Sequence, residues 1–170
     1  MPSTMTEEGV TSIAVPPLTM LLHSVAQHAV VLIPAAGGCS LSLLTTDGRR
    51  ITSVATDRTG YALTALCDRA SENPCSSAWR NRDVVLADIS AGPAGWPWAA
   101  HARDLGIRTV LAAALISGER RIGTVSVMSS EPAAFGTTDV EMFTDFARDA
   151  AHRIDACQSP RHVTPSRVAV

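Results

Sequence analysis

Two cysteines, Cys67 and Cys75, are the residues of this chain best suited to do chemistry. Asn73 is a preferred helix N-cap and Pro74 suits the first helical position, so Cys75 is predicted to lie in the first turn of a helix. The free N–H groups and the dipole of a helix start favour the reactive thiolate. A turn over residues 71–73 would bring Cys67 within bridging distance. Two interpretations are open: a redox pair, or two small buried hydrophobic residues.

The other cysteines and the histidines show no pattern of a metal site. Cys39 and Cys157 complete the four cysteines, which include no C-x-x-C pair and no histidine at zinc-finger spacing. A Ser-His-Asp order and a phosphate-binding glycine loop are also missing from the sequence. The residues therefore leave the cofactor unknown and give no positive evidence for an enzymatic reaction.

Composition excludes several classes of protein. A chain of 170 residues is long enough for one domain with a core and too short for two ordinary domains. Its 14 basic and 16 acidic residues leave a formal net charge of -2, without the positive excess that binds phosphate backbones. The N-terminal residues form no signal peptide and lead into no apolar run of membrane-spanning length. We expect a cytoplasmic protein that contacts neither nucleic acid nor membrane directly.

Hydrophobic periodicity predicts alternating helices and hairpins between two flexible tails, residues 1–16 and 158–170, which flank one domain over 17–157. A capping box of Thr138 and Glu141 is predicted to open the last helix. The predicted helices are 18–33, 59–69, 74–80, 97–104 and 138–157, and the predicted strands are 39–45, 51–56, 84–87, 109–115 and 121–128.

This order of elements, with several short motifs in sequence, resembles a GAF domain over residues 18–156. More narrowly it is similar to the sensor half of bacterial GAF–ANTAR regulators, which implies a role in signal transduction and transcription regulation. Two departures are present: Ser-Glu-Asn at 71–73 replaces the usual Gly-Glu-Gly, and no RNA-binding helical module is expected after Cys157. The motifs are Asn73-Pro74-Cys75, the stretch from Asp88 to Trp96-Pro97, Gly106-Ile107-Arg108-Thr109-Val110-Leu111, Gly123 and Ala134-Phe135.

The resemblance implies an α+β fold with a central antiparallel sheet of five or six strands. The terminal helices would cover one face and the short helices the other, around a cavity for a small molecule. Strand alternation then places Cys39, Leu41, Leu43, Gly123, Val125 and Val127 against the terminal helices, and Ser40, Ser42, Leu44, Ile122, Thr124, Ser126 and Met128 toward the cavity.

The expected ligand contacts are Ser42, Cys75, Trp79, Trp96, Thr124 and Ser126, with small hydroxyls orienting a ligand and indoles closing over it. The competing interpretation is that the hydroxyls bond to backbone in a filled core and that the tryptophans are ordinary core residues.

Three functional hypotheses follow from these features. The first is a stand-alone sensor that binds a small molecule or reads redox state through Cys67 and Cys75, and acts through a homodimer or a protein effector. The second is a thiol-dependent reductase similar to free methionine sulfoxide reductases, and the third is a dimerisation module without a ligand. A homodimer through the first and last helices is expected because Met20, Val30 and Val31 lie outside the main apolar stripe.

Overall fold

A single antiparallel sheet of five strands organises the chain, which a computed structural model describes for residues 17–90 and 97–158. The predicted tails and Trp96 lie outside these described residues, apart from Gln158 at the end of the last helix. The elements are α1 (Pro17–Leu32), β1 (Gly38–Leu44), β2 (Arg50–Ala55), α2 (Arg58–Arg69), α3 (Pro74–Asn81), β3 (Val84–Asp88), α4 (Trp98–Asp104), β4 (Thr109–Ser117), β5 (Arg120–Ser129) and α5 (Thr137–Gln158).

The strands lie in the order β2-β1-β5-β4-β3, and every neighbouring pair is antiparallel. Two hairpins, β1–β2 and β4–β5, meet where β1 pairs with β5 in the middle of the sheet. The predicted antiparallel platform is therefore confirmed, with five strands.

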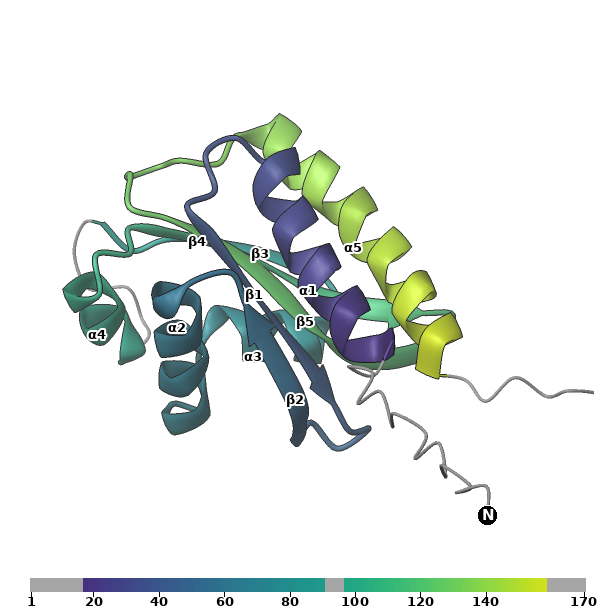
Figure 1. Cartoon of the computed structure of the whole chain (residues 1–170). Coiled ribbons are helices and arrows are strands. Elements are labelled where there is room, and N and C mark those ends of the chain that lie inside the picture. The colour runs from purple at the N-terminus through teal and green to yellow at the C-terminus, as the bar shows by residue number, and fades with distance from the viewer. Residues whose placement is uncertain (1–16, 91–96, 159–170) are drawn as a thin grey trace, which may run out of the picture.

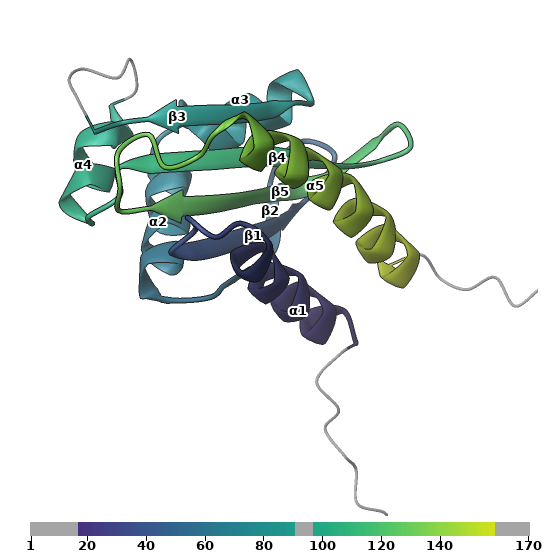
Figure 2. The same cartoon turned by 90° about the horizontal axis from the view of Figure 1, so that it is seen from above.

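Helices cover the two faces of the sheet in the predicted arrangement. Helices α1 and α5 lie side by side on one face, whereas α2, α3 and α4 lie on the other (Figures 1 and 2). Each face has its own apolar core. The core under α1 and α5 includes Leu22, Val25, Ala29, Leu41, Leu43, Val125, Val127, Phe143, Ala147 and Ile154. The core under α2 and α4 includes Leu63, Ala87, Ile89, Trp98, Ala102, Val110 and Met128.

Two β-bulges interrupt the alternation of side chains. In the β1–β2 pair Leu43 faces Thr52 and Leu44 faces Arg50, so Ile51 has no partner. The pairing of β4 with β5 skips Ile122 in the same way. A bulge turns the following side chains to the opposite face. Ile122, expected on the cavity side, consequently packs in the core under α1 and α5.

The start of α5 also differs from the expected capping box. Helix α5 begins at Thr137, and the carboxylate of Asp139 accepts a 2.9 Å hydrogen bond from the N–H of Gly136. Asp139 thus caps the helix start in place of the predicted Thr138 and Glu141 pair, because the helix begins one residue earlier. Within residues 17–90 and 97–158, no helix is both long enough and apolar enough to cross a membrane.

Candidate functional site

Asn73 fixes the start of α3 and ties it to the end of α2. Its side-chain oxygen accepts from the N–H of Ser76 at 2.9 Å, and its own N–H donates to Ser76 Oγ at 3.1 Å, which completes a capping box. The amide nitrogen of Asn73 donates to the carbonyl oxygens of Ala70 at 2.8 Å and Cys67 at 3.3 Å. This buried asparagine therefore holds the last turn of α2 against the first turn of α3.

The same connection brings the two predicted thiols together. Cys75 is the second residue of α3, directly after Pro74, and Cys67 lies in the last turns of α2. Both residues line the same pocket, and each thiol shifts the pKa of the other. Both residues are half-buried and carry no disulfide. The sequence prediction that Cys75 lies in the first turn of a helix is confirmed, and the bridging distance to Cys67 stays a prediction.

Hydrogen bonding gives the two sulfurs opposite protonation preferences. Hydrogen bonding by the Cys67 thiol lowers the pKa of Cys75 below its ordinary value, against the opposing effect of burial, and the hydroxyls of Ser126 and Thr124 lower it further. The pKa of Cys67 is raised, first by that same hydrogen bond and then by burial. Loss of a proton is therefore favoured at Cys75 over Cys67.

Hydroxyl side chains from the middle of the sheet form the floor under Cys75. Ser42 is paired with Thr124, and Ser40 with Ser126, across β1 and β5. The hydroxyls of Ser40 and Ser126 lie 2.9 Å apart, and all four residues are buried. These hydroxyls provide donors to a thiolate without filling the space above it.

Arg50 places a positive charge beside the thiol pair. The bulge between β1 and β2 pairs Arg50 with Leu44 and so turns its side chain toward the cavity face. Its Nε donates to Ser42 Oγ at 3.3 Å, and its Nη1 forms an ion pair with Asp68 of α2. The guanidinium also lowers the pKa of Cys75, because its positive charge favours the thiolate.

Trp79 closes the pocket one turn further along α3. The guanidinium of Arg121 lies 4.7 Å from the centre of its ring, and Arg121 Nη1 donates to the Trp79 carbonyl at 2.9 Å. On the other side lies the β1–β2 turn, where Gly48 has a φ of 85° and a Cβ would be 3.3 Å from Trp79 Nε1. The indole is therefore held between this turn and Arg121.

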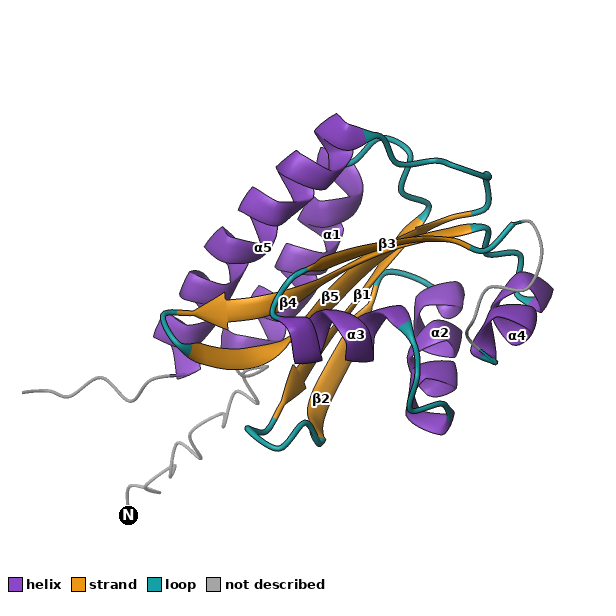
Figure 3. Ribbon diagram, turned by 180° about the vertical axis from the view of Figure 1, so that it is seen from behind, coloured by secondary structure: helices purple, strands orange, loops and turns teal. Residues whose placement is uncertain are grey.

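These side chains line a pocket of about 140 Å³. The pocket lies on the face of the sheet that carries α2 and α3, and Figure 3 shows both helices on that face. A water molecule takes up about 30 Å³ in the liquid, whereas drug-sized ligands occupy pockets of about 300–1,000 Å³. The volume suits a polar molecule of a few heavy atoms. The lining residues are Leu44, Gly48, Arg50, Cys67, Asp68, Asn73, Cys75, Ser76, Trp79 and Thr124.

The structure brings most of the predicted site residues together. Cys67, Cys75, Trp79 and Thr124 line the pocket, and Ser126 lies close enough to lower the pKa of Cys75. Ser42 does not line the pocket, but it accepts a hydrogen bond from Arg50, which does. Trp96 lies outside the described residues. Arg50 and Asp68 were missed, since counting alternation back from Val54 places Arg50 on the opposite face.

The other two cysteines differ from this pair in their surroundings. Cys39 packs in the core under α1 and α5, and burial is the main reason its pKa is raised. Cys157 is exposed near the end of α5. In the described part of the chain, no cluster of three or more His, Cys, Asp or Glu side chains could hold a metal ion.

Comparison with protein families assigns the fold. A family model described as GAF domain matches residues 17–155. The chain belongs to the GAF domain family. GAF domains generally act as small-molecule-binding sensor or signalling modules. A comparison with curated proteins finds no match.

Solved structures share this GAF fold at low sequence identity. A GAF domain region of a putative membrane protein from Geobacter sulfurreducens PCA has a TM-score of 0.64 and 14% identity, covering 82% of this chain and 93% of the other. The GAF-B domain of DevS from Mycobacterium smegmatis has a TM-score of 0.57 and 18% identity, and the match covers 82% of this chain and 93% of that domain. The type II free methionine-R-sulfoxide reductase from Thermoplasma acidophilum has a TM-score of 0.56 and 15% identity, and the match covers 82% of this chain and 95% of the reductase.

Proposed function

We propose that this GAF domain is a thiol-based redox sensor, in which Cys75 reacts with a small hydroperoxide and Cys67 then forms a disulfide with it. The observation that carries the proposal is that Cys75, at the start of α3, and Cys67, near the end of α2, line the same small pocket. A sensor of this kind needs one thiolate, one resolving thiol within reach, and access for a small oxidant.

The proposed reaction has two balanced steps. The Cys75 thiolate attacks the terminal oxygen of the hydroperoxide, the O–O bond breaks, and the leaving alkoxide or hydroxide takes up a proton, which leaves Cys75 as a sulfenic acid. Cys67 then loses its proton and attacks the Cys75 sulfur. The S–S bond forms as hydroxide leaves and takes that proton to become water. One hydroperoxide is reduced by two electrons while the two thiols are oxidised.

The surroundings support different roles for the two cysteines. Ser126, Thr124 and Arg50 stabilise the anionic form of Cys75, so Cys75 is the nucleophile. Cys67 keeps its proton until the sulfenic acid forms. The small pocket admits hydrogen peroxide or a short alkyl hydroperoxide and rejects bulky oxidants.

Mass spectrometry on peroxide-treated protein tests this proposal. We expect the wild type to lose two hydrogens through a Cys67–Cys75 disulfide, and Cys67→Ala to stop at a Cys75 sulfenic acid trapped by dimedone. Cys75→Ala should form neither product, whereas the control Cys157→Ala should behave as the wild type. Oxidation that starts at Cys157, or a Cys75 that stays reduced under peroxide, would show the proposal to be wrong.

The reductase hypothesis uses the same pair of thiols with a different oxidant. We retain it because one structural neighbour is described as a free methionine-R-sulfoxide reductase. At 15% identity, that likeness shows a shared fold and not a shared activity. Release of methionine from free methionine sulfoxide in the presence of a thiol donor would favour that enzyme. Disulfide formation by hydroperoxide without such turnover would favour the sensor.

We also propose that the cytoplasmic domain signals through a homodimer or protein effector, as in transcription regulators of the GAF–ANTAR type. Helix α1 carries no Asp, Glu, Lys or Arg. Its Met20 and Val31 are 63% and 80% exposed. Residues eleven apart lie about three turns along the same helix face. A second copy of this helix would cover both side chains.

A further inference from the structure

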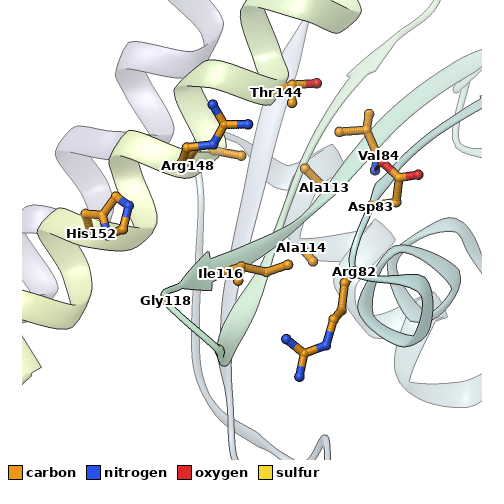
Figure 4. Close-up of a pocket in the computed structure, with 11 residues that line it drawn as sticks. Arg82, Asp83, Val84, Ala113, Ala114, Ile116, Gly118, Thr144, Arg148 and His152 are labelled. Carbon is orange, nitrogen blue, oxygen red and sulfur yellow. Dashed lines mark hydrogen bonds between the residues drawn. The ribbon is translucent and has the colours of Figure 1, made fainter.

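A larger concavity, of about 430 Å³, lies at the sheet edge beside α5 and differs from the thiol pocket in how its polar groups lie. Figure 4 shows Arg148 and His152 on the α5 side of this concavity, with Arg82 on the opposite side of β4. Its charged groups therefore do not converge on one ligand. In the thiol pocket, the side chains of two helices and the sheet converge on Cys75.

Trp79 is the largest of the described side chains that line the thiol pocket. It lies four residues after Cys75 on α3, and side chains at this spacing are neighbours on one helix face. Only 9% of Trp79 is exposed, so most of the indole packs against protein. This ring therefore limits the space that a reagent can occupy beside the Cys75 sulfur.

Contacts on an edge and on a face hold the indole of Trp79 in place. A Cβ at Gly48 would lie 3.3 Å from Trp79 Nε1, so the β1–β2 turn is already close to the edge of the ring. The guanidinium of Arg121 lies 4.7 Å from the ring centre, and Arg121 Nη1 donates to the Trp79 carbonyl at 2.9 Å. The ring consequently does not swing aside to enlarge the pocket without losing these contacts.

The strand register sends two neighbouring arginines of β5 to different helices. Arg121 is paired with Ile116 and Arg120 with Ser117, and successive residues of a strand point to opposite faces. Arg121 thus reaches Trp79 on α3, whereas Arg120 forms an ion pair of 3.0 Å with Asp155 on α5. Arg120 is therefore a matched control for Arg121.

The geometry of attack explains why a ring beside Cys75 selects among hydroperoxides. The sulfur, the attacked oxygen and the leaving oxygen must be roughly in line, so the organic group extends away from the sulfur into the pocket. At about 30 Å³ for each water-sized atom, a pocket of about 140 Å³ has room for about five heavy atoms. Hydrogen peroxide and ethyl hydroperoxide fit this limit, whereas cumene hydroperoxide exceeds it.

We propose that Trp79 sets the substrate class of the thiol pocket. It admits hydrogen peroxide and short primary hydroperoxides, and it excludes hydroperoxides that carry a branched or aromatic carbon next to the peroxide. Arg121 is a positioning residue that acts through Trp79, because it contacts this residue and does not itself line the pocket. The inference rests on the proposed function of Cys75.

Reagents of two sizes test this role of Trp79. In the full chain with Cys157→Ala, which removes an exposed thiol, hydrogen peroxide is compared with cumene hydroperoxide, and iodoacetamide with its phenyl amide, iodoacetanilide. Mass spectrometry of the peptide that contains Cys75 gives each rate. Trp79→Ala should raise the ratio of the bulky to the small reagent's rate at least about tenfold in both pairs, because the space of the indole becomes free.

Variants of the two arginines test how the ring is held. Arg121→Gln should raise the same ratio about two- to fivefold, since the ring loses its cation, and Arg121→Lys should restore most of the wild-type ratio. Arg120→Gln should leave the ratio unchanged. An unchanged ratio in Trp79→Ala, or a rise in Arg120→Gln equal to that in Arg121→Gln, would overturn the proposal.

The two reagent pairs separate this proposal from the proposed redox function. Selection between the iodoacetamides that is lost in Trp79→Ala, together with no oxidation of Cys75 by hydrogen peroxide, would support the size limit and overturn the redox sensor. Oxidation of Cys75 by both hydroperoxides, at a ratio that Trp79→Ala does not change, would overturn the size limit and leave the redox sensor standing.

Discussion

Gly123 on β5 is the position at which one added methyl group should most damage the sheet. A Cβ there would lie 2.1 Å from the Ser42 carbonyl oxygen, 3.1 Å from the Ser42 carbonyl carbon and 3.2 Å from Leu43 Cα. All three are backbone atoms of β1, so no change of rotamer relieves the clash. Since carbon and carbonyl oxygen normally approach to about 3.3 Å, Gly123→Ala must separate the two strands by about 1 Å.

The cost of this separation follows from what the strands lose. Two backbone hydrogen bonds next to the clash would weaken or break, at about 1 kcal/mol each. Overpacking of a closely packed interior adds about 1–3 kcal/mol. We therefore expect Gly123→Ala to lower the free energy of unfolding by about 3–5 kcal/mol, a large part of the roughly 5–15 kcal/mol typical of a domain.

Urea unfolding followed by circular dichroism measures this change. The control is Gly136→Ala, where a Cβ would meet nothing within 4 Å, and its free energy of unfolding should stay within about 1 kcal/mol of the wild type. The strand shift should also slow alkylation of Cys75, because Ser42 and Thr124 lie beneath the thiol pair. A free energy of unfolding for Gly123→Ala within about 1 kcal/mol of the wild type would refute the close approach.

Three further predictions concern the cap, the thiolate and the exposed helix. Asn73→Ala should lower the free energy of unfolding in urea by about 1–2 kcal/mol, because a buried cap and its carbonyl bonds are lost; no change would mean the cap is dispensable. Thr124→Val should shift the pH profile of Cys75 alkylation to higher pH, since the hydroxyl lowers the pKa of that thiol; an unchanged profile contradicts this role. Val31→Asp should convert dimers to monomers in sedimentation while Tyr61→Asp, at an exposed site on α2, does not; a persistent dimer would place the contact elsewhere.

Local signals in the sequence were sufficient to predict most of the fold. Asn73 and Pro74 marked the start of α3 because capping and proline geometry depend on adjacent residues. Strand alternation correctly separated Leu41 and Val125, under the terminal helices, from Ser42 on the other face. The prediction of the α5 cap was wrong. Helix α5 begins at Thr137, one residue before the predicted start, and at that position Asp139 accepts the hydrogen bond from the Gly136 N–H.

The parts of the site that escaped prediction depend on β-bulges. Alternation assumes an unbroken pleat, and one unpaired residue reverses it. Ile51 leaves the pairing and Arg50 turns toward the thiols, while Ile122 moves under α1 and α5. A bulge is set by pairing between strands, so neither position was evident from its neighbours in sequence. Asp68 was missed with Arg50, because its role depends on that ion pair.

Helix α3 carries the proposed redox centre at one end and an aromatic reporter one turn away. Cys75 and Trp79 are four residues apart, so both side chains project from the same face of this short helix. The indole lies against the β1–β2 turn at Gly48 and under the guanidinium of Arg121. Any displacement of the first turn must therefore alter the polarity around the Trp79 fluorophore. Emission from this tryptophan offers an intrinsic optical signal for events at the sulfur atoms.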